Sequence, residues 1–101
     1  VCIKIGGIYV RAVTTLSGVV NVAIRPEELI LSREKLASSA INSFEGKITE
    51  IRSTGLEVIV YVDIGIILAA TLTPQSVERL SLKKGDSVFV TFKATAVHVF
   101  A

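Results

Sequence analysis

Several residue types that carry chemistry are scarce in this chain of 101 residues. The one cysteine, Cys2, excludes an internal disulfide and a cysteine-rich zinc site. The one histidine, His98, lies in an apolar stretch, where we expect a structural or surface role rather than a Ser-His-Asp triad. No GxGxxG or GxxxxGK sequence is present to hold a nucleotide phosphate. The sequence therefore does not predict an enzyme.

Long hydrophobic runs and a strong charge of either sign are also lacking. No apolar run approaches the roughly 20 residues that a membrane-spanning helix requires. The net charge is only +2, too small for a protein dedicated to duplex DNA. The cations do not alternate with the six aromatic residues, as binding of single strands requires. Nucleic acid is therefore not an expected partner.

The chain contains no methionine, and residues 1–5 already have the pattern of a strand. These two features favour a fragment of a longer protein. Removal of an initiator methionine before Val1 is the alternative.

Hydrophobic residues make up 50% of the chain and recur mainly with a period of two, which is typical of strands. Alternating segments occupy residues 8–12, 20–25, 56–63 and 85–96, with glycine-containing turns between them, and a turn at residues 63–65 leads into a further segment at residues 66–71. In the segment at residues 85–96 one face is expected to carry Val88, Val90, Phe92, Ala94 and Ala96. Several short strands of this kind predict an all-β sandwich or small barrel.

One segment departs from this pattern. Thr73 followed by Pro74 is the expected start of a short helix over residues 73–80. Val77 and Leu80 would face inward, and residues 83–85 would end the element. The polar residues 32–39 form the best candidate linker. We therefore divide the chain into a small N-terminal β unit with its linker, residues 1–38, and a self-contained β unit, residues 39–101.

Hydroxyl and cationic side chains gather near the boundaries of these elements. A helix N-terminus supplies unpaired N–H groups for an anion, and the closing strand would add donors from a second direction. The candidates are Ser38, Ser39, Thr73, Ser76, Arg79, Lys93 and Thr95. A purely structural explanation stays open, in which Thr73 only caps the helix and the cations are solvated.

From Ser39 onward the sequence resembles the molybdate-binding MOP/TOBE domain family, whose fold is an OB-like barrel. The matching motifs are residues 39–48 (SAINSFEGKI), residues 73–76 (TPQS) with Arg79 and Leu80, residues 83–86 (KKGD) and residues 90–97 (VTFKATAV). Residues 22–32, which contain the sequence IRPE, resemble the C-terminal regions of ABC-transporter ATP-binding subunits.

This resemblance implies the regulatory C-terminal domain of a molybdate/tungstate importer, in which the cytoplasmic oxyanion binds between domains and inhibits transport. The implied ligands of the oxyanion, the only cofactor-like molecule expected, are Ser39, Thr73, Ser76, Arg79, Lys93 and Ala94, the last through its backbone N–H. The implied partners are a second copy in a homodimer or higher homo-oligomer and, through the parent ATPase, a nucleotide-binding domain and a permease at the inner face of the membrane. ATP hydrolysis would belong to that parent.

One position departs from the family pattern, because Ile41 stands where the family has an arginine that binds the oxyanion. Its absence removes a charge-assisted hydrogen bond. This favours, as an alternative, an assembly module that dimerises an ABC ATPase without sensing an anion. A freestanding molybdate-storage protein is a further alternative.

The implied ligand set fits a tetrahedral dianion such as molybdate or tungstate. All of its groups donate hydrogen bonds, and none is a carboxylate. Monoprotonated phosphate would leave its O–H unpaired there, at a cost of about 1–3 kcal/mol. Sulfate also lacks a proton, so only the size of the cavity could reject it.

Overall fold

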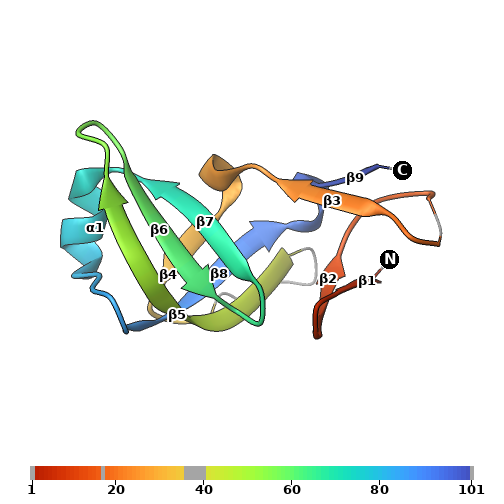
Figure 1. Cartoon of the computed structure of the whole chain (residues 1–101), viewed down its shortest axis with the longest axis horizontal. Helices are drawn as coiled ribbons and strands as arrows, with labels where there is room; N and C mark the ends of the chain where they lie inside the picture. The colour runs from red at the N-terminus through yellow and green to blue at the C-terminus, as the bar shows by residue number, and fades with distance from the viewer. Residues whose placement is uncertain (1, 17, 36–40, 101) are drawn as a thin grey trace.

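A computed structural model describes residues 2–16, 18–35 and 41–100 (Figure 1). In chain order the elements are β1 (Cys2–Ile5), β2 (Ile8–Arg11), β3 (Asn21–Ile24), the 3₁₀ turn η1 (Pro26–Glu28), β4 (Ile30–Ser32), β5 (Ile41–Ser53), β6 (Val58–Asp63), β7 (Ile67–Leu72), the helix α1 (Pro74–Leu80), β8 (Ser87–Lys93), the 3₁₀ turn η2 (Ala94–Ala96) and β9 (Val97–Phe100). The predicted all-β fold with one short helix is confirmed.

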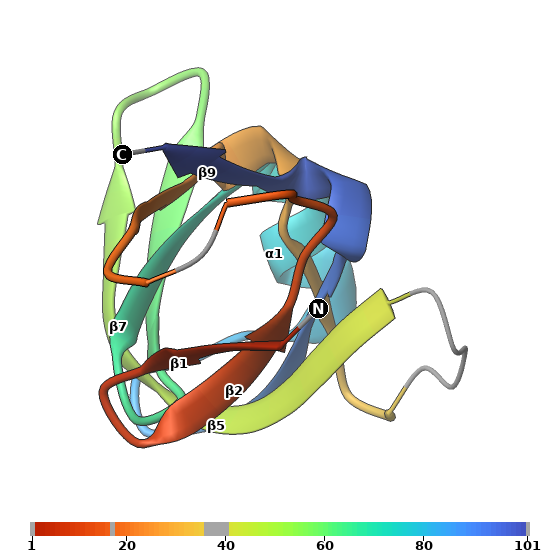
Figure 2. The same ribbon diagram turned by 90° about the vertical axis from the view of Figure 1, so that its right-hand side faces the viewer.

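The main sheet is antiparallel and has the strand order β4-β8-β5-β6-β7. Its longest strand, β5, pairs along its first half with β8, from Ile41 to Lys47, and along its second half with β6, from Lys47 to Ser53. The register shifts between Ile48 and Glu50. Viewed along the long axis, the strands curl around a central interior and α1 lies at the far end (Figure 2).

A glycine allows β5 and β6 to approach closely where β5 changes partner. A Cβ atom on Gly46 would lie 2.5 Å from the backbone oxygen of Asp63 and 2.7 Å from a methyl carbon of Ile64. No side chain fits at that separation, so the exchange of partners along β5 depends on a residue without a Cβ.

Two of the N-terminal strands, β3 and β4, pair with strands from the C-terminal part of the chain. Strand β4 forms one edge of the main sheet, where Ile30 pairs with Thr91. Strand β3 pairs with β9 in a separate ribbon, and β1 pairs with β2 in a hairpin. The main sheet thus contains strands from both sides of the predicted division at residue 38, which itself lies outside the described residues.

The core lies inside the curl and is built from aliphatic side chains and two phenylalanines. Phe92 is 1% exposed, and its ring lies 6.1 Å from that of the half-buried Phe44. The N-terminal strands contribute to the same core through Val10 and Leu31. Helix α1 covers one end of it with Val77 and Leu80, as predicted.

One detail of the prediction is wrong. The expected single strand over residues 85–96 ends at Lys93, and Ala94 and Ala96 lie in η2 instead of extending the strand face of Phe92. The small side chains there allow a tight turn, after which β9 leaves the main sheet to pair with β3. The helix ends at Leu80, as the predicted range of residues 73–80 has it, and Ser81 closes its last turn in the left-handed conformation at φ 52°.

Candidate functional site

The first group of predicted site residues lies at the start of α1. Thr73 is the N-cap, as predicted: its Oγ1 accepts a hydrogen bond of 3.1 Å from the Ser76 backbone N–H. The Thr73 hydroxyl also donates to Ser76 Oγ at 3.0 Å. Arg79 lies in the last turn of the same helix and is exposed. The structure therefore places two hydrogen-bonded hydroxyls and a cation on one helix of seven residues and its N-cap.

The second group lies where β8 passes into η2. Lys93 is the last residue of β8 and the residue that precedes the first turn of η2, and Ala94 follows it. A cavity of about 320 Å³ lies beside them. Its lining consists of Glu28, Ile30, Ile41, Thr91, Phe92, Lys93, Thr95 and Ala96. Lys93 and Thr95, which the sequence suggested would act together, thus line one cavity.

Strand β5 shows how far apart the two groups are. Lys93 pairs with Ile41, the first residue of β5. At the other end, Ser53 pairs with Val58, which pairs with Leu72, the residue before Thr73. The two groups therefore lie at opposite ends of this strand of 13 residues. One copy of the chain therefore does not bring its predicted ligands together.

Ser39, the remaining predicted ligand, lies outside the described residues. Ile41, two positions further on, lines the cavity beside Lys93. An apolar side chain therefore occupies the place from which the arginine of the MOP/TOBE motif would enter the cavity.

Sequence reasoning missed a carboxylate in this cavity. Glu28 of η1 lines it, and Glu28 Oε2 lies 3.8 Å from Nε2 of His98 on β9. The two residues meet because Ala23 pairs with His98, which places β9 beside the chain that leads into η1. This pairing joins residues far apart in sequence, and no local motif signals it.

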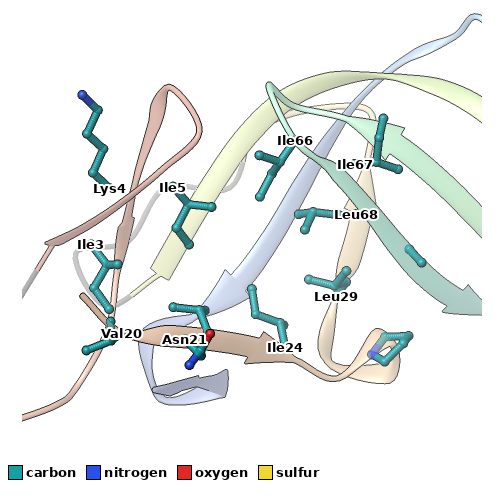
Figure 3. A pocket seen from close by; sticks show the side chains of 13 residues that line it. Ile3, Lys4, Ile5, Val20, Asn21, Ile24, Leu29, Ile66, Ile67 and Leu68 are labelled. Carbon is teal, nitrogen blue, oxygen red and sulfur yellow. The ribbon is translucent and has the colours of Figure 1, made fainter. Parts of the chain in front are cut away.

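A larger cavity of about 440 Å³ lies between β1, β3 and β7 (Figure 3). Its lining is mostly aliphatic, with Ile5, Leu29 and Leu68 among the side chains. Lys4 also borders it, but its side chain extends away from the others that are labelled (Figure 3). Asn21 is the other polar residue in its lining.

The Arg33 side chain forms hydrogen bonds with the backbone at the C-terminal end of α1. Its Nη2 donates to the backbone oxygens of Leu80 and Ser81 at 3.0 and 2.9 Å and to Asp86 Oδ2 at 2.9 Å. The hydrogen bond from Arg33 is the main cause that lowers the pKa of Asp86 below its usual value. This contact fixes α1, which carries Thr73 and Ser76, against the start of β8.

The described residues contain no group of three or more His, Cys, Asp or Glu side chains that could hold a metal ion. In the part of the chain that the structure describes, no helix has the length and apolar character needed to cross a membrane.

Comparison with known proteins gives matches of two kinds. Residues 38–99 match the TOBE domain family. Over 99 residues, 97% of this chain, the sequence is 34% identical to the molybdate/tungstate import ATP-binding proteins WtpC of Pyrococcus horikoshii and Pyrococcus abyssi. The chain spans 29% of the length of each of these relatives.

Among solved structures, the chain resembles the cytoplasmic molybdate-binding protein ModG in a crystal form with molybdate bound. The TM-score is 0.74 at 22% sequence identity, over 81% of this chain and 61% of ModG. This likeness supports the OB-like fold that the sequence predicted.

Proposed function

This chain belongs to the TOBE domain family, and on that premise we propose that it binds molybdate or tungstate as the regulatory domain of an import ATPase. The WtpC relatives are molybdate/tungstate import ATP-binding proteins, and ModG binds molybdate. The observation that carries the proposal is the cavity beside Lys93 and Thr95, which presents a cation and a hydroxyl next to the turn at Ala94.

The proposed ligands are Ser39, Thr73, Ser76, Arg79, Lys93 and the backbone N–H of Ala94. Hydroxyl, amide and cationic donors suit a tetrahedral dianion, which accepts hydrogen bonds at every oxygen and donates none. Arg79 and Lys93 would supply the positive charge that offsets the loss of the hydration of the ion.

The separation of the two groups along β5 favours a site built from two copies. Helix α1 of one copy would then meet the cavity beside Lys93 of the other, and a two-fold axis would generate two such sites. The oxyanion would stabilise the dimer, because it binds the paired state and not the separate chains.

In a parent transporter, preferential binding of the oxyanion to the paired state would regulate transport. Two domains held together by the oxyanion would keep the attached nucleotide-binding domains apart, so uptake would fall when the ion is plentiful. We place the domain at the cytoplasmic face of the membrane, joined to a permease through the parent ATPase. ATP hydrolysis would belong to that parent and not to this domain.

The second candidate is an assembly module that dimerises without sensing an anion. Ile41 in the cavity and Ile30, which is 53% exposed beside it, favour this function, because both present apolar surface where the proposed site needs charge.

Titration calorimetry of the chain with tungstate, molybdate and sulfate, together with its mass by light scattering, tests both candidates. We expect heat with tungstate and molybdate but not with sulfate, and a higher dimer fraction with tungstate. Lys93→Ala should abolish the heat, whereas Lys84→Ala, a change of an exposed lysine on a distant turn, should not. A dimer that binds none of the three ions would establish the assembly module instead.

A further inference from the structure

The cavity beside Lys93 combines groups of opposite charge. Four of its lining residues are polar: Glu28, Thr91, Lys93 and Thr95. The Thr91 hydroxyl is 3.1 Å from Ser43 Oγ, so part of its hydrogen-bonding capacity is used within the sheet. Thr95 and Lys93 are exposed and can donate to a ligand. Glu28 is the one carboxylate among the residues that line the cavity.

The position of Glu28 is fixed from two sides. Pro26 begins the short turn η1 that carries it, and Glu28 N–H donates to the Arg25 backbone oxygen at 3.0 Å. Its carboxylate faces His98 at 3.8 Å, a separation at which the imidazole contributes charge compensation only when it is protonated. The Glu28 side chain is 38% exposed, so water contacts part of it.

We propose that Glu28 is a specificity-determining residue of this cavity, one that weakens the binding of fully deprotonated tetrahedral oxyanions relative to oxyanions that carry a proton. The inference rests on the proposed function, whose site it modifies. A carboxylate accepts hydrogen bonds and cannot donate them, so molybdate or tungstate meets only repulsion from it. Monoprotonated phosphate can donate its O–H to the same carboxylate, so its binding affinity is reduced less.

Ile41, like Glu28, should lower the affinity of the cavity for a dianion. It is an apolar residue paired with Lys93, so this wall of the cavity has Lys93 as its cation while Glu28 adds a negative charge to the lining. Binding of a dianion would then depend on cations from elsewhere, such as Arg79 of a second copy. The result is a site of reduced affinity for a dianion.

Glu28→Gln tests this inference, because it keeps the size of the side chain and removes its charge. Glu27→Gln is the matched control: Glu27 lies in the same turn, is exposed and does not line the cavity. Titration calorimetry with sodium tungstate and with sodium phosphate gives both affinities for each protein. A melting curve confirms that each variant is folded, and Glu28→Ser replaces Glu28→Gln if the latter is not.

We expect Glu28→Gln to bind tungstate about tenfold more tightly than the wild type, from removal of one like charge near the ion. The ratio of tungstate to phosphate affinity should rise with it, and Glu27→Gln should leave both affinities unchanged. If the wild type binds tungstate and Glu28→Gln binds it equally well, the inference is wrong and the proposed function stands. If only Glu28→Gln binds, the inference holds and the proposed function fails for the natural chain. If neither binds, both are overturned.

Discussion

The guanidinium of Arg33 and the carboxylate of Asp86 form an ion pair of 2.9 Å across 53 positions of sequence. The same guanidinium also donates to the carbonyl oxygens of Leu80 and Ser81, at the C-terminal end of α1. Carbonyl groups at a helix end lack partners within the helix, and a cation is favourable there. Arg33 therefore stabilises the position of α1, the helix that carries the proposed ligands Ser76 and Arg79.

Replacement of Arg33 should loosen this attachment. We expect Arg33→Ala to lower the melting temperature and Arg33→Lys to restore only part of the loss, because an ammonium group cannot reproduce the planar fork of a guanidinium. Thermal denaturation followed by circular dichroism measures the effect. Lys35→Ala, at an exposed residue without a role in this contact, is the control. Equal melting temperatures for Arg33→Ala and the control would show that the contact contributes nothing to stability.

Asp86 should make stability depend on acidity. Its pKa in the folded protein is lowered from 3.8, mainly by the hydrogen bond from Arg33. A lowered folded-state pKa means that the charged form favours the fold, so the contribution is complete above the unfolded value and is lost as the pH falls through the folded pKa. Melting curves of the wild type and Asp86→Asn should therefore differ at neutral pH and converge below pH 3.8. A difference that persists unchanged in acid would contradict this assignment.

Gly46 should not tolerate a side chain. A Cβ there would lie 2.5 Å from the Asp63 backbone oxygen, and the pairing of β5 with β6 leaves no room for that oxygen to move. We expect Gly46→Ala to lower the free energy of unfolding in urea by about 1–3 kcal/mol, the usual cost of overpacking. Gly7→Ala is the control, because a Cβ on Gly7 meets no atom within 4 Å.

The features that the sequence predicted correctly have local causes. Thr73 and Pro74 determine the start of α1 through a cap and a fixed backbone angle, and both act within one turn. The strand near residues 58–63 follows from alternation with a period of two.

What the sequence did not reveal depends on contacts between distant residues. Strand β9 begins at Val97 because β3 offers it a partner, and without that pairing nothing local separates residues 97–100 from β8. The sequence predicted Ser76 on the helix and Lys93 on the closing strand, but only the strand register shows that Thr73 and Lys93 lie at opposite ends of β5. Glu28 lies in the short turn η1, and its place in the cavity follows from the fold.

Restoring the cation missing at position 41 should strengthen the proposed site. Ile41 pairs with Lys93 and lines the same cavity, so Ile41→Arg adds a guanidinium where the oxyanion would lie. We expect tungstate to bind about tenfold more tightly, which corresponds to one added charge-assisted hydrogen bond. Calorimetry gives the change, and Ile41→Gln separates the charge from the size of the side chain. An unchanged affinity in Ile41→Arg would place the oxyanion away from this cavity.

A mixing experiment determines whether two copies share each site. Ser76→Ala removes a ligand from the group on α1 and Lys93→Ala removes one from the other group, so each variant alone should bind tungstate weakly. In a mixed dimer, the intact α1 of the Lys93→Ala chain would face the intact Lys93 of the Ser76→Ala chain. One site would then be complete and the other would lack both ligands. After denaturation and joint refolding of equal amounts, about a quarter of the sites should bind with wild-type affinity, as random pairing of chains in a two-fold dimer requires. If the ligands came from a single copy, mixing would restore no binding.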